Sequence, residues 1–334
     1  TSWKIYNLRD IIFDENGILY VITSTYIFKV GTNNIVTRYG GNGSGWYTGD
    51  GGLATSASFY TAETVFDALG NLYFSDTENH VIRKIDTNGI ITTIAGDGSS
   101  GYTGDGGLAT SAKINKPRGL IFDSNGALYF SGSGNHVIRK INEDGIISTF
   151  AGKGIAGFSG DNGQASNAEI NTPEDIIIDE SGNIIFFGVG HGQFGRIRKI
   201  DTSGIITTIA GTDEIYNGDN ILATEARIIL PRNMAMDKND NLYVNEIAPR
   251  VHNSGHLTIN AYNISQFENH IRAVCNLDRV KLNKISNAEM INLIGDQITI
   301  YRKKKYASNE FFFDYLKKET KYKRKMGHLT TLIK

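Results

Sequence analysis

A short motif recurs along this chain at a nearly constant spacing. Gly-Asp-Gly-Gly-Leu-Ala-Thr begins at Gly49 and returns at Gly104, and a variant begins at Gly160, so the shifts are 55 and 56 residues. A weaker copy begins at Gly218. A fixed period of this length is typical of repeat proteins, in which each unit buries its apolar surface against its neighbours.

Each repeat contains four short apolar segments separated by turn residues. In the repeat that follows Asp105, we expect strands at 119–123, 127–131, 136–141 and 146–151. The dipeptides Asn-Gly and Asp-Gly between them readily adopt positive φ and so form tight turns. Four short strands in about 55 residues predict one blade of a β-propeller. No segment of this region keeps a helical period over ten residues, which excludes a helical solenoid.

The number of blades follows from the second strand of each repeat. Its apolar-aromatic pattern occurs five times, at 19–21, 72–74, 128–130, 184–186 and 242–244. The sequence therefore predicts a mainly β fold, with a partial β-propeller of four to five four-stranded blades over residues 1–240. A small α+β piece is expected over 241–334. We expect the blades to form an open arc, which leaves sheet edges unprotected.

The third strands carry a family resemblance. Asn-His-Val-Ile-Arg-Lys-Ile occurs at 79–85 and at 135–141, and Ile-Ile-Thr-Thr-Ile-Ala-Gly occurs at 90–96 and 205–211. Together with the Gly-Asp-Gly-Gly loop, these segments resemble teneurin-type NHL repeats over residues 5–244. Propellers of that family usually close with six blades. The resemblance implies a scaffold that binds an unknown protein or ligand through its loops.

Several polar residues of the repeats have both a structural and a functional interpretation. Calcium requires six to eight oxygen ligands, and each Gly-Asp loop offers about one carboxylate, so we interpret the Asp residues as turn-forming. His80 and His136 occupy equivalent positions in different blades, which favours hydrogen-bonded turn histidines over a shared metal site. The Arg-Lys pairs are interpreted as a solvated strand edge. They lie at 83–84, 139–140 and 198–199, and the Asp residues are Asp50, Asp105, Asp161 and Asp219.

Composition limits the possible environments and partners. The net charge is −1, yet Arg302 to Lys325 contains ten Lys/Arg and three acidic residues, a balance of +7, so the remainder carries −8. This asymmetry indicates two pieces of different origin. Cys275 is the one cysteine, so no intrachain disulfide is possible. We see no signal peptide and no apolar run that could span a bilayer, and we expect a cytoplasmic protein without nucleic-acid partners.

After Val244 the repeat stops. The segment 245–256 fits no blade, and 265–274 is predicted to be an amphipathic helix capped by Ser265. Residues 290–295 are predicted to form a short buried strand and turn, and the chain from Lys317 to His328 is strongly basic.

These segments resemble, in order and spacing, the C-terminal end of 5-(carboxyamino)imidazole ribonucleotide synthase. The resemblance covers residues 241–334. This ATP-grasp ligase of purine biosynthesis, also known as the phosphoribosylaminoimidazole carboxylase ATPase subunit, activates bicarbonate with ATP and carboxylates aminoimidazole ribonucleotide. The resemblance therefore implies Mg²⁺ and ATP as cofactors, whereas none is expected for the propeller.

The resemblance also assigns roles to individual residues. Glu246 is the expected metal ligand, and Arg250 is the expected catalytic residue. Its planar guanidinium can form paired hydrogen bonds with bicarbonate or carboxyphosphate. In a strand, residues four apart point to the same face, so both can face one site. The expected substrate-binding residues are His252, Asn253, Ser254, His256, Lys318, Arg324 and Lys325, of which the last three would hold the ribonucleotide phosphate. Without the resemblance of the preceding segments, the basic tail would be interpreted as a run of charged residues in contact with solvent. Tyr322-Lys323 replace the usual Pro-Gly of the family, and Lys321 replaces Arg.

The functional prediction depends on the parts of an ATP-grasp ligase that lie outside its C-terminal end. An ATP-grasp ligase requires an N-terminal substrate domain, a lysine-bearing lobe and an earlier metal carboxylate, and propeller blades occupy that place here. We therefore expect a composite chain, a binding scaffold fused near 240–244 to an enzyme fragment that is not catalytic alone. Two alternatives stay open: an active ligase completed by another chain, and an NHL interaction protein with a spurious tail.

Overall fold

The structure is a computed structural model. It describes residues 7–33, 35–190, 194–212, 222–226, 228–229, 233–236, 242–245, 286–294, 297–314 and 325–333. The chain divides into two compact units, residues 1–247 and 248–334.

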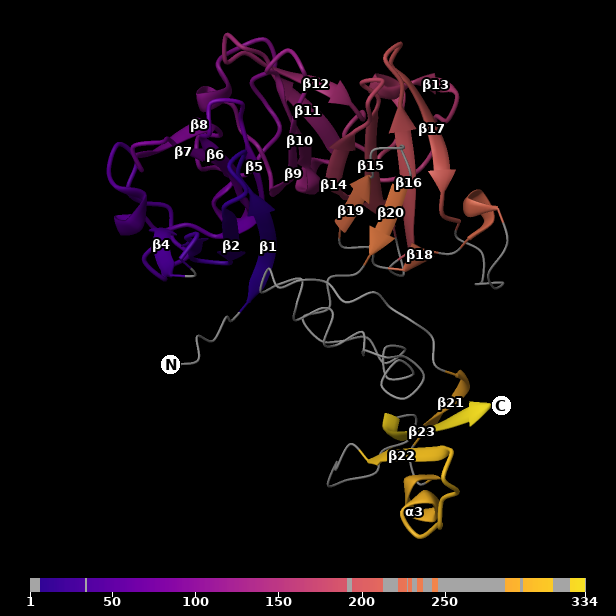
Figure 1. Ribbon diagram of the computed structural model, residues 1–334. Helices are drawn as coiled ribbons and strands as arrows, with labels where there is room; N and C mark the ends of the chain where they lie inside the picture. The colour runs from indigo at the N-terminus through magenta and orange to yellow at the C-terminus, as the bar shows by residue number, and fades with distance from the viewer. Residues whose placement is uncertain are drawn as a thin grey trace. The chain divides into compact units, whose positions relative to one another are not determined.

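The first unit is built from four-stranded antiparallel sheets, which we call blades 1 to 4 (Figure 1). The four main strands of each sheet keep their order in the sequence, and a two-stranded sheet follows as blade 5. Blade 1 contains β1 (Leu8–Phe13), β2 (Leu19–Thr23), β3 (Ile27–Val30) and β4 (Val36–Gly40). Blade 2 contains β5 (Thr61–Phe66), β6 (Leu72–Asp76), β7 (Val81–Ile85) and β8 (Ile91–Ala95), and blade 3 contains β9 (Pro117–Phe122), β10 (Leu128–Gly132), β11 (Val137–Ile141) and β12 (Ile147–Ala151). Blade 4 contains β14 (Pro173–Ile178), β15 (Ile184–Val189), β16 (Phe194–Ile200) and β17 (Ile205–Ala210), and it is extended by β13 (Gly163–Gln164) and β18 (Ile228–Ile229); blade 5 contains β19 (Asn233–Met236) and β20 (Leu242–Asn245). Short 3₁₀ turns lie at Ala54–Ser56, Thr77–Asn79, Ala109–Ser111, Ser133–Asn135, Ala165–Asn167 and Ala223–Glu225.

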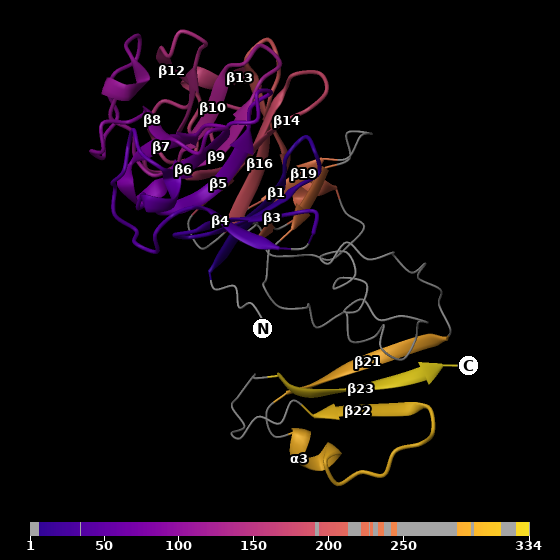
Figure 2. The same cartoon turned by 60° about the vertical axis from the view of Figure 1, so that its left-hand side comes forward.

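The first strands of successive blades pack against one another. β1 contacts β5, β5 contacts β9, β9 contacts β14, and β14 contacts β19 (Figure 2). The first strand of each blade is therefore the innermost one, as in a propeller. The predicted partial propeller of four to five blades is confirmed, and the strands of blade 3 match the expected ranges within two residues.

The core of this unit lies between blades, because each sheet buries its faces only against its neighbours. Between blades 1 and 2, Ala57 and Phe59 from the connecting loop pack with Leu72 and Phe74. Gly49 lies in the same loop at φ +94°, and a Cβ there would lie 2.7 Å from the Cβ of Ala57. The recurring glycine of the motif is thus required by both backbone conformation and close packing.

The second unit contains a three-stranded antiparallel sheet and one short helix. Its elements are β21 (Asn287–Ile294), α3 (Gln297–Tyr301), β22 (Glu310–Asp314) and β23 (Lys325–Ile333), and β23 lies between the other two strands. Leu293 and Ile298 form its buried centre. The strand predicted at 290–295 is the second half of β21, whereas the helix predicted at 265–274 lies outside the described residues. Among the described residues, no helix has the length and apolarity to cross a membrane.

Candidate functional site

Most of the residues expected from the ligase resemblance lie outside the described part of the chain. These are Glu246, Arg250, His252, Asn253, Ser254, His256, Lys318 and Arg324. The description reaches Lys325, which begins β23 and lies opposite Ile294 of β21. The roles of all nine residues therefore stay predictions.

The strand that begins at Lys325, β23, pairs with another strand on each side. β23 pairs with β21 from Lys325 to Ile333 and with β22 from Gly327 to Thr331. Within it, the buried imidazole of His328 stacks on the ring of Phe313 with a centroid distance of 4.6 Å. The end of the basic tail is thus a central strand, so the backbone at Lys325 has a fixed position in the sheet.

The other basic run of this unit, 302–305, is partly neutralised by its own neighbours. Arg302 forms two contacts with the Asp314 carboxylate, at 2.6 and 3.1 Å, and Lys304 lies 3.0 Å from Glu310. These ion pairs balance part of the local positive charge, so this part requires no bound anion.

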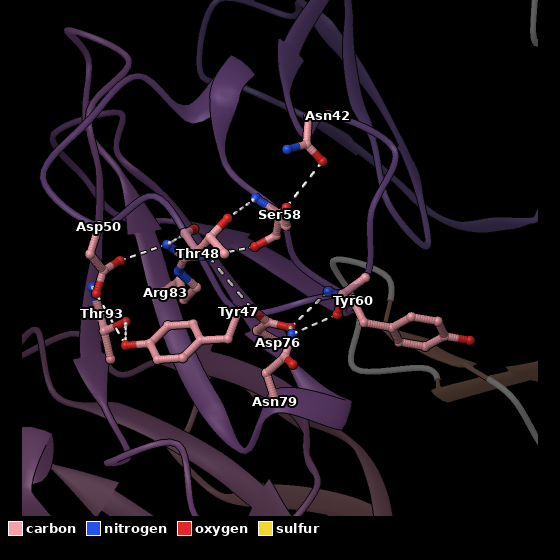
Figure 3. A network of polar contacts seen from close by, with 11 residues as sticks. Asn42, Tyr47, Thr48, Asp50, Ser58, Tyr60, Asp76, Asn79, Arg83 and Thr93 are labelled. Carbon is pink, nitrogen blue, oxygen red and sulfur yellow. Dashed lines mark hydrogen bonds and ion pairs between the residues drawn. The ribbon is translucent and has the colours of Figure 1, made fainter.

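In blade 2, a buried arginine joins the third strand to the loop before the blade (Figure 3). The Arg83 guanidinium donates to the carboxylate of Asp50 at 2.6 Å and to the carbonyl oxygens of Thr48 and Ser58 at 3.0 and 2.9 Å. The second oxygen of Asp50 accepts the backbone N–H of Thr93 at 3.2 Å. Burial raises the pKa of Asp50, but hydrogen bonds from Thr93 and Arg83 outweigh it and lower the pKa overall.

The same arrangement recurs in the next two blades. Arg139 pairs with Asp105, and Arg198 pairs with Asp161 at 2.5 Å. The interpretation of the Arg-Lys pairs as a solvated edge is wrong for the arginines, which are buried because the preceding loop covers that side of the strand. Asp50, Asp105 and Asp161 accept backbone N–H groups, as expected, but these groups belong to the fourth strand of the blade and the arginine is the second partner. Asp219 lies outside the described residues. Among the described residues, no group of three or more His, Cys, Asp or Glu could hold a metal ion.

Blade 2 also contains a buried acid that its neighbours lack. Asp76 ends β6, where blades 3 and 4 have Gly132 and Gly188. One oxygen accepts the N–H of Tyr60 at 2.7 Å and the amide of Asn79, and the other lies 3.8 Å from Arg83. Burial is the main cause that raises the pKa of Asp76 to about 6.

The two turn histidines have the structural role expected from the sequence. His80 and His136 adopt positive φ, +56° and +58°. The Nδ1 atom of each accepts a backbone N–H from the start of the next blade, that of Lys116 at 3.2 Å and that of Thr172 at 3.1 Å. Burial lowers the pKa of both side chains, which favours the neutral form that this acceptor role requires.

Three acidic side chains on the innermost strands form a cluster that the sequence reasoning missed. Asp10 accepts the hydroxyl of Thr64 at 2.7 Å, and Asp175 accepts the N–H of Met234 at 2.7 Å, so each ties its strand to that of the next blade. Glu63 lies between them, and burial together with the Asp10 and Asp175 charges raises its pKa well above the usual range. Alignment of the first strands would have placed these acids at the same position of blades 1, 2 and 4, where blade 3 has Gly119.

Comparison with known families agrees with both resemblances. Residues 97–156 match a teneurin NHL domain, residues 233–267 match an ATP-grasp domain, and residues 288–334 match a phosphoribosylaminoimidazole carboxylase C-terminal domain. The two resemblances found in the sequence are thereby confirmed for these parts of the chain.

The curated relatives are ribonucleotide synthases, matched over the C-terminal part. The chain is 41% identical over 112 residues to the N5-carboxyaminoimidazole ribonucleotide synthase of Bacillus subtilis, which is 33% of this chain and 30% of that enzyme. With the Staphylococcus haemolyticus enzyme it shares 46% identity over 99 residues, 29% of this chain and 26% of that enzyme. The chain thus spans less than a third of the length of these relatives.

Solved structures similar to the chain include a virginiamycin B lyase from Staphylococcus aureus, with 18% identity and a TM-score of 0.44 over 72% of this chain and 64% of that one. A gluconolactonase from Xanthomonas campestris has 14% identity and a TM-score of 0.44, with 71% of this chain and 68% of that one covered.

Proposed function

We propose that this chain is a binding protein in which a partial propeller carries a ribonucleotide-recognising fragment that does not catalyse carboxylation alone. The observation that carries the proposal is the extent of the match. The chain matches the synthase over 30% or less of the enzyme's length, and the described residues before 233 belong to propeller blades and the loops between them. An ATP-grasp ligase depends on positioning ATP and its substrate between lobes, and positioning supplies most of the catalysis in phosphoryl transfer.

The polar chemistry of the blades supports a scaffold rather than an active site. In blades 2 to 4, the buried arginine pairs with the loop aspartate and donates to neighbouring backbone carbonyl groups. These groups therefore serve folding, and the loops are the parts of the blades that remain for contact with a partner.

The phosphate-binding role of the tail rests on three cations, Lys318, Arg324 and Lys325. The neighbouring Arg302 and Lys304 are engaged by Asp314 and Glu310, so they are poorer candidates. Glu246 would hold Mg²⁺ if MgATP bound, and the metal would then screen the ATP phosphates. Arg250 and the polar residues at 252–256 would orient the ribonucleotide.

Calorimetric titration of the full chain with a ribonucleotide 5′-phosphate tests this role. We expect weak binding that strengthens at low salt, because contacts between cations and a phosphate are screened by ions. Changing Arg324 and Lys325 to Ala should abolish the binding heat. Changing Lys303 and Lys305 to Ala is the matched control, because both are exposed lysines of the same unit. Equal loss in both double variants would contradict the proposal and indicate nonspecific charge attraction.

A further inference from the structure

Successive blades are joined by a hydrogen bond at the start of the innermost strand, and its donor and acceptor differ between blades. At the joint between blades 1 and 2, the N–H of Thr61, the first residue of β5, donates to the carbonyl oxygen of Ser24 at 2.9 Å. Pro117 and Pro173 stand at the equivalent position of β9 and β14. Because proline has no N–H, blades 3 and 4 cannot form this backbone contact.

A histidine takes part in the contact at both joints that contain a proline. The N–H of the residue before each proline donates to the Nδ1 atom of a histidine in the preceding blade. The pairs are Lys116 with His80, at 3.2 Å, and Thr172 with His136, at 3.1 Å. A backbone carbonyl accepts a hydrogen bond at any pH, whereas both nitrogens of a protonated imidazole are donors. These two joints therefore depend on the protonation of a side chain, and the contact of Thr61 does not.

The two donor residues have a backbone conformation that needs support from its surroundings. The φ angle is +48° at Lys116 and +38° at Thr172. Positive φ is uncommon for residues other than glycine and least favourable for a β-branched residue such as threonine. A residue before proline also prefers an extended backbone. Such a conformation persists only where neighbouring contacts maintain it, so loss of the histidine acceptor should allow this residue to relax.

The surroundings of the two imidazoles keep them neutral near pH 7. Burial is the main cause that lowers the pKa of His80, while the charge of Glu78 raises it and that of Lys116 lowers it. At His136, the positions equivalent to these charged residues hold a glycine and a threonine, and burial lowers its pKa. Protonation of both therefore requires a pH below about 6.5, the ordinary pKa of histidine. The two contacts are complete above this pH and are lost as the pH falls further.

Other contacts at the same joints do not depend on pH in this range. The hydroxyl of Thr77 donates to the carbonyl oxygen of Pro117 at 2.7 Å, and the hydroxyl of Ser133 donates to that of Pro173. Hydroxyl groups do not titrate near neutral pH, so these contacts keep neighbouring blades attached. Acid should therefore loosen the entry to β9 and β14 without separating the blades.

We propose that His80 and His136 make the joints between blades 2 and 3 and between blades 3 and 4 acid-sensitive, so that acid releases the entry to β9 and β14 while β5 stays attached. The device lies in the scaffold itself and does not depend on the ribonucleotide-binding role of the C-terminal unit. It would change the arrangement of blades 2 to 4 in response to pH alone.

Amide hydrogen exchange of the full chain, followed residue by residue by NMR at about pH 7.5 and about pH 5, tests the proposal. Rates are corrected for the intrinsic pH dependence of exchange. The protection of the Lys116 and Thr172 amides should fall about tenfold in acid, the effect of losing one hydrogen bond. The amide of Thr61 is the reference within the same molecule, and its protection should stay constant.

The chain with both His80→Asn and His136→Asn is the matched variant. The Oδ1 atom of asparagine is bonded to Cγ, as Nδ1 of histidine is, and it accepts an N–H at either pH. Asparagine also tolerates the positive φ of these two positions, +56° and +58°. In this variant, the protection of the Lys116 and Thr172 amides should not change between the two pH values.

Three results would overturn the proposal. The first is protection of Lys116 and Thr172 that does not change with pH in the unmodified chain. The second is an equal loss at Thr61, which would indicate general acid unfolding of the unit. The third is an equal loss in the asparagine variant. Should that variant fail to fold, the comparison with Thr61 in the unmodified chain still decides the question.

Discussion

At the scale of single residues, the buried arginine of the third strand is the most informative side chain of the repeat. A buried guanidinium is costly unless its N–H groups find acceptors and its charge finds a partner. Arg139 donates to the carbonyl oxygens of Lys113 and Thr103 and pairs with the Asp105 carboxylate. Because these acceptors come from the loop before the blade, one side chain fixes that loop against the third strand.

Replacement of Arg139 should therefore affect stability far more than replacement of the next residue. We expect Arg139→Met to lower the free energy of unfolding by about 3 kcal/mol, since it leaves buried carbonyl groups and a carboxylate without a donor. Lys140→Met is the control, because Lys140 is half-buried and pairs loosely with Asp123 at 3.5 Å. It should cost about 1 kcal/mol or less. Chemical denaturation followed by circular dichroism measures both, and equal losses would contradict the assigned role.

Asp76 should make the stability of blade 2 depend on pH. Its pKa is raised from 3.8 to about 6 in the folded chain, so the folded state keeps a proton that the unfolded chain has already released. The resulting stabilisation is complete below about pH 4 and is lost as the pH rises through about 6.

Asp76→Asn removes this titration while keeping an oxygen that can accept the N–H of Tyr60. We expect its free energy of unfolding, relative to the unmodified chain, to improve by up to about 3 kcal/mol between about pH 4 and pH 7. Denaturation curves at several pH values provide the measurement. A difference between the two proteins that does not change with pH would show that Asp76 does not titrate in this range.

At the scale of elements, the innermost strands β9 and β14 pack closely against each other at one glycine. Gly119 lies in β9, and a Cβ at this position would meet the carbonyl oxygen of Glu174 at 2.6 Å and the nitrogen of Ile176 at 2.8 Å. Both atoms belong to the backbone of β14, so they cannot move aside without shifting that strand. The glycine therefore sets how closely blades 3 and 4 pack.

Gly119→Ala should be strongly destabilising for this reason. We expect a loss of about 2–3 kcal/mol in the free energy of unfolding, the usual cost of overpacking a core. Gly45→Ala is a suitable control, because the nearest atom to its Cβ would be a Tyr60 side-chain carbon at 3.4 Å, an ordinary contact. A thermal melt of both variants tests the difference, and an unchanged melting temperature for Gly119→Ala would show that the two strands can separate at little cost.

Strands and turns were predictable from the sequence where neighbouring residues determine them. Features that depend on residues far apart in the sequence were less predictable. Turn dipeptides and alternating apolar residues determine a strand within a few positions, so the strands of blade 3 followed from the sequence. The burial of Arg83 did not, because its partner Asp50 lies 33 residues earlier and pairs with it only after the blade has folded. Helix α3, with five residues, is too short for a helical period to be recognised. For the candidate site, the sequence supplied residue roles by resemblance, and the backbone of Lys325 is the part that the structure describes.

At the scale of the whole molecule, the chain combines two units with different physical organisation. The first buries its core between repeated sheets, so each blade depends on its neighbours. The second has its own small core around Leu293 and Ile298, in a sheet whose central strand begins at Lys325. Two of the family matches each lie within one unit, the NHL domain at 97–156 and the synthase C-terminal domain at 288–334, whereas the ATP-grasp match at 233–267 crosses the boundary between the units.

The central claim, a binding protein without ligase activity of its own, is tested most directly by ATP turnover. The purified chain is mixed with ATP, Mg²⁺, bicarbonate and aminoimidazole ribonucleotide, and phosphate release is compared with that of its Glu246→Ala variant. A bacterial N5-carboxyaminoimidazole ribonucleotide synthase serves as the positive control. We predict that the chain and the variant release phosphate at the same background rate, with or without the ribonucleotide, because the described residues before 233 form blades and not a lobe that could position the γ-phosphate. Phosphate release that requires the ribonucleotide and bicarbonate, and that is lost in Glu246→Ala, would contradict the account.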